Sequence, residues 1–278
     1  MPAALEPAVI DIRPTGRWKP LRLGELWRYR ELMMFLAWRD IKVRYKQTAL
    51  GVCWAVLQPL LAMLIFTVFF GRFARLPSDG LPYPLFAFCG LLPWQMFSNS
   101  LSESGGSLVA NRNLITKVYF PRLVIPMAPV IAGLVDFLIS FVILIGMMAW
   151  YRITPGPRIL LVPFFVLLAA TTAMSAGIWL SALNVRYRDV RYVIPFLTQF
   201  WLYATPIAYS IALVPPRWRP WLALNPMVGV VEGFRWSILG TGSDPGTSLW
   251  ISLGVVAVLL MSGLYYFRRM ESSFADIV

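Results

Sequence analysis

Long apolar segments dominate this sequence and limit what it can fold into. A helix that crosses the hydrocarbon core of a bilayer needs roughly 20 mostly apolar residues. Only 14% of the 278 residues are charged, against about a quarter in soluble domains. The sequence therefore predicts an all-α integral membrane protein with six transmembrane helices and no soluble domain. The predicted spans are about 50–70, 84–103, 123–150, 159–183, 192–213 and 249–267.

The distribution of Lys and Arg predicts how these spans are oriented. The net charge is +12, and 18 of the 25 Lys and Arg residues lie in the N-terminal segment, the second and fourth loops and the C-terminal tail. Lys and Arg are retained on the cytoplasmic side of membranes. We therefore expect both termini and the loops 104–122 and 184–191 in the cytoplasm.

The chain is expected to divide into four parts. They are a cytoplasmic N-terminal segment (1–24), an amphipathic helix (25–48), a single transmembrane domain (49–267) and a cytoplasmic tail (268–278). Some 49 mostly polar residues precede the first span, and no small-residue cleavage site follows its apolar run. The first span is therefore not expected to be a cleaved signal peptide.

The segment ELWRYRELMMFLAWRDIKVRYK (25–46) predicts a helix that lies along the membrane surface. At helical spacing it has a charged stripe and an adjoining apolar stripe. Asp40 and Arg44, four residues apart, are in position to pair with each other. One interpretation is an anchor, in which each cation near the membrane surface contributes about 1 kcal/mol of attraction to anionic lipid. The other is a lever that passes movement of a partner protein into the membrane, because the helix continues without a spacer into the first span. The charged stripe is Arg28, Glu31, Arg39, Lys42 and Lys46, and the apolar stripe is Trp27, Met34, Trp38, Ile41 and Tyr45.

The fifth connection, 214–248, contains an apolar stretch that is too interrupted for a full span. In WLALNPMVGVVEGFRWSILG (221–240), Asn225, Pro226 and several glycines break the pattern. This predicts two short helices that enter the outer leaflet and return, lining or closing a path, because broken helices at membrane depth need protein or water around them. The alternative is an amphipathic loop on the surface.

Several kinds of chemistry have no support in the sequence. There is no histidine, and the two cysteines, Cys53 and Cys89, lie inside apolar segments. This argues against a zinc site, a disulfide framework and His-based acid–base catalysis. The phosphate-binding pattern G-x-x-x-x-G-K-[ST] is absent, so the chain does not hydrolyse ATP by that route. We expect no catalytic residue, metal or cofactor in this chain.

The cytoplasmic loop SGGSLVANRNLITKVYFPR (104–122) contains a short helix-like piece, NLITKVYF, between a Gly-Gly pair and a proline. A helix of about two turns held across the membrane face suits docking into a cleft of another protein.

Four ordered blocks of the sequence resemble one family. They are RDIKVRYKQTALGVCWAVLQP, NLITKVYFPR, LNVRYRDVRYVIPFLTQFWLYATPIAYS and LNPMVGVVEGFRWSILG. Over about residues 25–267 the chain is similar to the permease subunits of type-2 ABC transporters that export polysaccharides across the bacterial inner membrane, above all the O-antigen and capsular polysaccharide permeases.

The resemblance implies a homodimer of six-helix subunits that binds two copies of a separate ATPase, which holds ATP and Mg²⁺. The dimer would form a channel for a lipid-linked glycan: O-antigen first, with capsular polysaccharide or teichoic acid as alternatives. By the same resemblance, 25–46 is the interface helix, 113–120 the coupling helix and 225–239 the outer gate. The implied coupling residues are Arg28, Glu31, Arg39, Asp40, Lys42, Arg44, Lys46, Asn113, Leu114, Lys117 and Tyr119; the implied gate residues are Trp221, Asn225, Pro226, Glu232, Arg235 and Trp236.

Aromatic side chains are candidates for contact with the glycan, because sugar rings stack on them without recognising one sugar. The alternative is that they mark the bilayer interfaces, where Trp and Tyr gather in any membrane protein. The candidates for the substrate path are Trp94, Phe97, Trp201, Tyr203 and Tyr209, with Trp221 and Trp236 of the gate.

Asp136 is the carboxylate deepest in a predicted span. Such groups are costly in the membrane and face protein or water. Asp136 is expected to contact sugar hydroxyls, to pair with an Arg or to hold helices together, and we favour a structural or dimer-contact role. Pro59, Pro195 and Pro206 are expected to kink their helices.

Two other classes of protein remain to be considered. A secondary transporter normally needs several buried carboxylates or paired inverted repeats, whereas this chain has one deep Asp and no evident internal symmetry. A membrane-embedded glycosyltransferase or acyltransferase would need acid–base groups at the membrane surface, and the lack of histidine weakens that interpretation.

Overall fold

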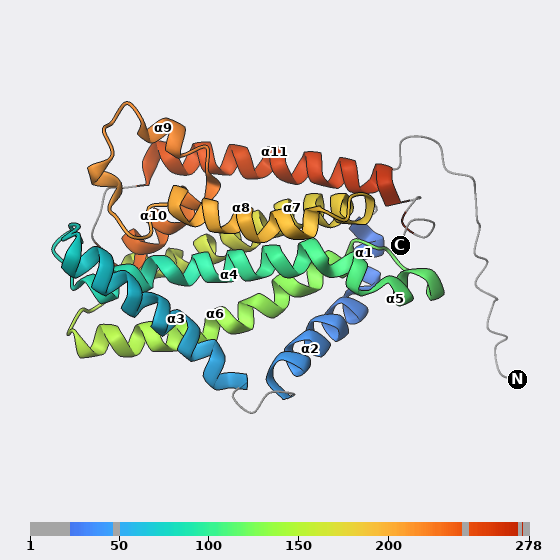
Figure 1. Ribbon diagram of the computed structural model, residues 1–278, viewed down its shortest axis with the longest axis horizontal. Helices are drawn as coiled ribbons and strands as arrows, with labels where there is room; N and C mark the ends of the chain where they lie inside the picture. The colour runs from blue at the N-terminus through green and yellow to red at the C-terminus, as the bar shows by residue number, and fades with distance from the viewer. Residues whose placement is uncertain (1–22, 47–50, 241–244, 272–273, 275–278) are drawn as a thin grey trace, which may run out of the picture.

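The computed structural model describes residues 23–46, 51–240, 245–271 and 274, and every regular element in them is a helix (Figure 1). This confirms the all-α prediction. Most of the predicted terminal segments 1–24 and 268–278, and the junction 47–50 before the first span, lie outside the described residues. The α-helices are α1 (Leu23–Arg28), α2 (Arg30–Lys46), α3 (Gly51–Phe66), α4 (Tyr83–Ala110), α5 (Arg112–Lys117), α6 (Val124–Trp150), α7 (Val162–Arg186), α8 (Val190–Ala204), α9 (Arg219–Leu222), α10 (Pro226–Leu239) and α11 (Gly246–Met270); η1 (Thr67–Phe73) is a π-helix, and η2 (Pro157–Leu161) and η3 (Ile211–Leu213) are 3-10 helices.

Four segments of the described residues are long and apolar enough to cross a membrane: Cys53–Phe73, Val124–Trp150, Pro157–Arg186 and Gly246–Met270. They correspond to the first, third, fourth and sixth predicted spans. The second and fifth predicted spans differ for separate reasons. Helix α4 is 28 residues long, but its second half is rich in Ser and Gly, whereas α8 has only 15 residues.

The polar half of α4 is buried against α6 and α7, in the centre of the molecule (Figure 1). Ser104 donates a hydrogen bond to the Pro126 carbonyl of α6 at 2.8 Å, and Asn184 of α7 donates to the Gly105 carbonyl at 3.0 Å. A Cβ at Gly177 would collide with the Ser104 side chain. Small residues and interhelical hydrogen bonds of this kind hold helices together in membranes, which explains why this helix has low hydropathy.

The fifth predicted span is wrong at its C-terminal end. We expected a helix to residue 213, but α8 ends at Ala204, and Thr205 is extended with φ −103° and ψ 135°. The cause is Pro206, because the residue before a proline is pushed away from helical geometry. Pro59 and Pro195 instead lie inside α3 and α8, so Pro206 ends its helix where a kink was predicted.

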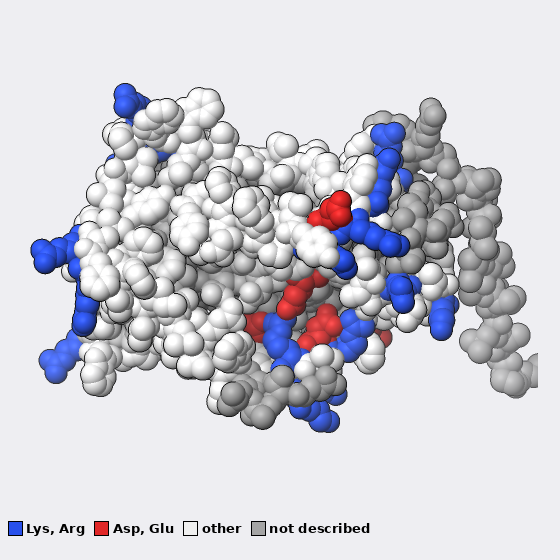
Figure 2. All heavy atoms as spheres, viewed as in Figure 1, with Lys and Arg blue, Asp and Glu red and all other residues white. Residues whose placement is uncertain are grey.

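The two ends of the helix bundle differ in structure. Helices α1 and α5 and the C-terminal end of α11 lie together at one end, whereas α9 and α10 lie at the other (Figure 1). At the first end, Leu36, Ile115 and Phe267 belong to one buried apolar cluster. Blue side chains gather at both ends and white ones fill most of the surface between them, apart from a group of red and blue side chains near the centre of the view, as Figure 2 shows. This distribution fits a protein that crosses a bilayer.

Candidate functional site

Helix α2 packs on α6 through a face that the two predicted stripes did not identify. Leu36 and Ala37 are its buried residues. The apolar residues Trp27, Met34 and Trp38 point outward, with 70%, 58% and 57% of their surface exposed. The predicted apolar stripe is therefore not the face by which α2 packs on the bundle, and its contact with the membrane surface stays a prediction.

The predicted single helix 25–46 is divided at Tyr29 into α1 and α2. Its predicted charged stripe is largely exposed, at Arg28 of α1 and at Glu31, Lys42 and Lys46 of α2. Arg39 is the exception. It forms an ion pair with Asp40 at 2.8 Å and donates to the Asn111 side chain at 2.8 Å, at the junction between α4 and α5. The predicted pairing of Asp40 with Arg44 is therefore corrected: Asp40 pairs with its neighbour, and Arg44 reaches residues far away in the sequence.

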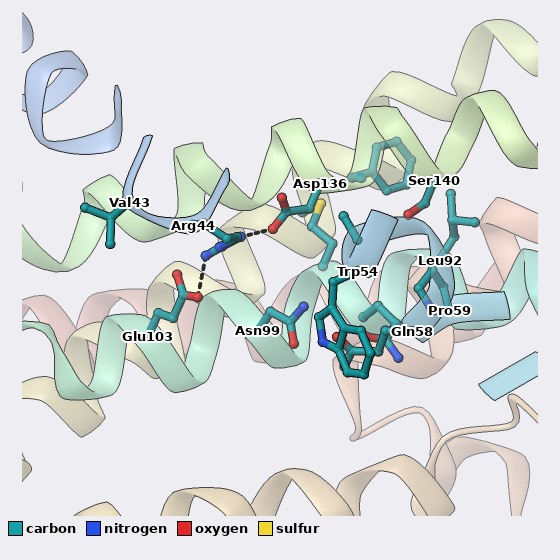
Figure 3. A pocket seen from close by; sticks show the side chains of 14 residues that line it. Val43, Arg44, Trp54, Gln58, Pro59, Leu92, Asn99, Glu103, Asp136 and Ser140 are labelled. Carbon is teal, nitrogen blue, oxygen red and sulfur yellow. Dashed lines mark hydrogen bonds and ion pairs between the residues drawn. The ribbon is translucent and has the colours of Figure 1, made fainter. Parts of the chain in front are cut away.

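Arg44 forms ion pairs with Glu103 of α4 and Asp136 of α6 (Figure 3). Tyr45 donates a second hydrogen bond to the Asp136 carboxylate. Burial raises the pKa of Tyr45, so its hydroxyl keeps the proton that it donates. These contacts give Asp136 one of its expected roles, pairing with an Arg, and they tie the end of α2 to two helices of the bundle.

The lever interpretation of α2 changes accordingly. Helix α2 ends at Lys46 and α3 begins at Gly51, with the junction outside the described residues. The two helices form a V in Figure 1, so they are not one straight rod. Near its C-terminal end, α2 is connected to the bundle through the contacts of Arg44 and Tyr45 with Asp136.

A cavity of about 620 Å³ opens beside this ion-pair cluster, between α3, α4 and α6. Arg44, Glu103 and Asp136 line one part of it, and Trp54, Gln58 and Asn99 line another (Figure 3). Sequence analysis missed this site, although polar residues at i, i+4 spacing within apolar helices were a visible signal. Among the described residues, no three Cys, Asp or Glu side chains are close enough together to bind a metal ion.

The predicted coupling helix 113–120 is shorter in the structure: α5 ends at Lys117 and Val118 is extended, at the end of the bundle that also holds α1 (Figure 1). Asn113, Lys117 and Tyr119 are exposed, the last at 91%. Leu114 is half-buried and Ile115 is buried, so they attach the segment to the bundle. The segment thus offers a protruding polar and aromatic surface, and its role in docking stays a prediction.

The predicted gate consists of the two short helices α9 and α10, at the opposite end from α5 (Figure 1). Asn225 begins α10: its side-chain oxygen accepts hydrogen bonds from the Met227 amide at 3.0 Å and from the Trp201 indole at 2.6 Å. Pro226, at the first position of α10, suits a helix start. Trp221 is 68% exposed, and its role in the gate stays a prediction.

Helix α10 is buried against α4, α7 and α11, unlike an amphipathic loop on the surface. Its charged residues Glu232 and Arg235 are 7% and 3% exposed. They form an ion pair in which Nη1 of Arg235 lies 3.6 Å from Oε1 of Glu232. The Arg235 guanidinium also donates to carbonyl groups of α4 and of the chain after α8. Trp236 is half-buried, with the guanidinium of Arg158 4.5 Å from its ring centre.

The predicted glycan-contacting aromatics fall into two groups. Trp94 and Phe97 are buried, and Phe97 packs edge-on against Trp201 at 5.0 Å. Tyr209 is half-buried and Tyr203 is 62% exposed. Their contact with glycan stays a prediction.

An exposed aromatic row on α8 was missed by sequence analysis. Tyr192, Phe196 and Phe200 are 67%, 73% and 66% exposed, and with Tyr203 they repeat every three or four residues. That spacing places them on one face of the helix, and it was readable in the sequence.

Comparisons with known proteins point to one family. A family model described as ABC-2 type transporter matches residues 31–239. The chain is 32% identical over 253 residues to the O-antigen export system permease protein RfbA of Myxococcus xanthus, covering 89% of this chain and 96% of that one. It is 28% identical over 250 residues to the protein of the same name from Klebsiella pneumoniae, covering 89% and 95%. It is 27% identical over 245 residues to the polysialic acid transport protein KpsM of Escherichia coli, covering 84% and 92%.

Proposed function

The chain belongs to the ABC-2 type transporter family, and from this membership we propose that it is the permease subunit of an ATP-driven exporter of a lipid-linked polysaccharide. One observation carries the proposal: the 32% identity to an O-antigen export permease extends over almost the whole of both chains. O-antigen, the polysaccharide of lipopolysaccharide, is accordingly the favoured cargo. The chain acts as a channel-forming subunit and not as an enzyme.

The proposed arrangement assigns each end of the bundle to one side of the bacterial inner membrane. Helices α3, α4, α6, α7, α8 and α11 are the six spans, with α10 re-entering from the outer side as the gate. The end with α1, α2 and α5 faces the cytoplasm, together with both termini. Two copies of a separate ATPase bind there and hold ATP and Mg²⁺, so this chain needs no cofactor of its own.

The channel is proposed to form in a homodimer. The aromatic row on α8 is exposed in the single chain, and α3 has exposed apolar residues such as Leu61 and Leu64, at 44% and 55%. A contact between two copies would cover part of these faces. The aromatic row then supplies sites where sugar rings stack, in addition to the candidates Tyr203 and Tyr209.

Capsular polysaccharide is the second candidate cargo, because the chain is also 27% identical to a polysialic acid transport protein. Teichoic acid export remains a third possibility within the same family.

The test is to delete the chain in its own host and analyse lipid-linked glycans by mass spectrometry. We expect an elongated lipid-linked polysaccharide to accumulate in the cytoplasmic leaflet, with loss of the surface polysaccharide. Expressing the chain with its ATPase should restore export, and expressing either one alone should not. Normal surface polysaccharide in the deletion strain would contradict the proposed function.

A further inference from the structure

We propose that the cavity between α3, α4 and α6 is a subsite that binds a neutral sugar unit of the exported glycan. This inference rests on the proposed function and adds a place and a ligand class to it. The cavity volume of about 620 Å³ lies within the range of about 300–1,000 Å³ that is usual for ligand pockets.

Three helices direct polar side chains into this cavity at the same spacing. Gln95, Asn99 and Glu103 follow one another at intervals of four residues on α4, and all three line the cavity. Trp54 and Gln58 do so on α3, and Asp136 and Ser140 on α6. Residues four apart lie on the same face of a helix, so each of the three helices has polar side chains on the face that lines the cavity.

The amide side chains of this cavity lack protein partners. Within the part of the chain that the structure describes, the side chains of Gln58, Gln95 and Asn99 form no hydrogen bond with protein. Gln95 and Asn99 of α4 are half-buried, whereas Gln58 of α3 is exposed on a segment that is long and apolar enough to cross a membrane. An amide left without partners in a low-dielectric region costs free energy. A ligand that both donates and accepts hydrogen bonds would satisfy all three.

The chemistry of the lining favours a sugar over the other parts of a lipid-linked glycan. An amide offers two donor hydrogens and one acceptor oxygen, which matches hydroxyl groups that also donate and accept. Trp54, which is 54% exposed, adds an aromatic face for the apolar side of a sugar ring. An acyl chain would leave the amides unsatisfied.

The charges of the cavity disfavour the phosphate part of a lipid carrier. Arg44 is its cationic side chain, and it already pairs with both Glu103 and Asp136. With both carboxylates ionised, the lining carries one more negative charge than positive. A pyrophosphate would be repelled, whereas the hydroxyls of an uncharged sugar would not.

The experiment places a photoreactive amino acid, p-benzoylphenylalanine, at Ala55 of the full chain, expressed with its ATPase in the native host. Ala55 lines the cavity but is not one of its polar groups. The matched control position is Val142 of α6, which is 68% exposed and outside the cavity. After illumination, the cross-linked products are digested and identified by mass spectrometry.

We expect sugar adducts at Ala55 and not at Val142. In the Ala55 background, Asn99→Leu, which keeps a similar volume, should lower the sugar adduct by about tenfold, since each lost hydrogen bond is worth about 1 kcal/mol and more than one is lost. Asn99→Gln should restore part of the yield, which a purely structural role would not predict.

Other outcomes separate the subsite from the proposed function. Adducts at Ala55 that contain only polyprenyl phosphate or acyl chains would overturn the sugar subsite. Absence of any glycan adduct there, in cells that export glycan through this chain, would overturn it while leaving the proposed function intact. Normal export in the strain that lacks the chain would overturn the proposed function itself.

Discussion

The guanidinium of Arg235 donates a hydrogen bond to the Pro206 carbonyl at 2.6 Å, which ties the buried helix α10 to the point where α8 ends. It also donates to the Ile207 carbonyl at 2.5 Å and to the Phe86 carbonyl of α4 at 3.3 Å. Carbonyl groups after a helix end need partners from elsewhere. A side chain of the proposed gate thus supplies hydrogen-bond partners for two carbonyl groups that lie just after the end of α8.

We predict that Arg235→Met destabilises the protein by about 3–5 kcal/mol, because it leaves Glu232 as a buried charge without its cation and removes the donors to three carbonyl groups. Thermal unfolding of the purified chain in detergent measures the effect. If α10 is the gate, the same variant should conduct ions as a dimer in planar bilayers without ATP.

Arg217→Met is the matched control, because Arg217 is exposed and should be replaceable with little change in stability. Adding Glu232→Gln to Arg235→Met should recover part of the lost stability, since the unpaired charge is then gone. An Arg235→Met protein that is as stable and as tightly closed as the unaltered one would contradict the anchoring role.

The second prediction concerns the contact between α2 and α6. Asp136→Asn removes the charge that Arg44 and Tyr45 share and should weaken the attachment of α2 by about 1.5–3 kcal/mol, the usual contribution of hydrogen bonds to charged groups. If α2 transmits movement from the ATPase, the complex should still hydrolyse ATP but export less glycan for each ATP. Both rates are measured in reconstituted vesicles.

Arg30→Met is the control for Asp136→Asn, because Arg30 is exposed on α2 and is not one of the implied coupling residues. Its loss should leave the ratio of export to hydrolysis unchanged. The Arg44→Met and Asp136→Asn changes should be non-additive when combined, because they remove the same interaction. Two outcomes would rule out this contact as the route of coupling: additive effects of the Arg44→Met and Asp136→Asn changes, or an Asp136→Asn variant that exports as much glycan for each ATP as the unaltered protein.

Sequence reasoning succeeded where the membrane itself imposes the pattern. The predicted span 123–150 agrees with α6 (Val124–Trp150) within one residue, because hydropathy alone defines a lipid-facing helix. The predicted fifth span extends nine residues beyond the C-terminal end of α8. The apolar sequence continues past Pro206, although the helix itself has ended at Ala204.

The partners of charged residues were beyond what periodicity provides. Arg44 and Asp136 are 92 residues apart, and a local rule favoured Asp40 as the partner because it lies four residues away. The anchoring role of Arg235 was hidden for the same reason: its partners are main-chain carbonyls of α4 and of the chain after α8, which carry no side-chain signal in the sequence.

The third prediction concerns the exposed surface of the α5 segment. The paired change Lys117→Glu with Tyr119→Ala should leave thermal stability unchanged, because both side chains are exposed, and should lower the affinity for the ATPase by about tenfold or more. Ile115→Ala should instead cost about 2–5 kcal/mol of stability, because that side chain is buried. Trp150→Ala, at 84% exposure on α6, is the control away from this surface. Unchanged ATPase binding by the paired variant would exclude α5 as the docking surface.

The fourth prediction concerns orientation. Single cysteines at Thr116 and at Arg217, both exposed, are introduced after Cys53 and Cys89 have been replaced. A membrane-impermeant maleimide should label Arg217→Cys in intact spheroplasts, and Thr116→Cys only once the membrane is permeabilised. Labelling of both positions from the same side would be incompatible with the six-span arrangement.

The last prediction uses a glycine that sets the distance between the gate helix and α7. A Cβ at Gly233 of α10 would overlap the ring of Phe165, so Gly233→Ala must displace α10 or that ring. Overpacking of this kind costs about 1–3 kcal/mol, which exceeds the gain of about 0.5–1 kcal/mol from replacing glycine inside a helix. The variant should therefore unfold at a lower temperature and leak ions at rest.

Gly254→Ala, on α11 where nothing lies within 4 Å of the new Cβ, should be neutral or stabilising and remain closed. Adding Phe165→Leu to Gly233→Ala should restore part of the barrier by making room for the methyl group. If Gly233→Ala matches Gly254→Ala in both stability and conductance, the packing of α10 on α7 does not hold the channel closed.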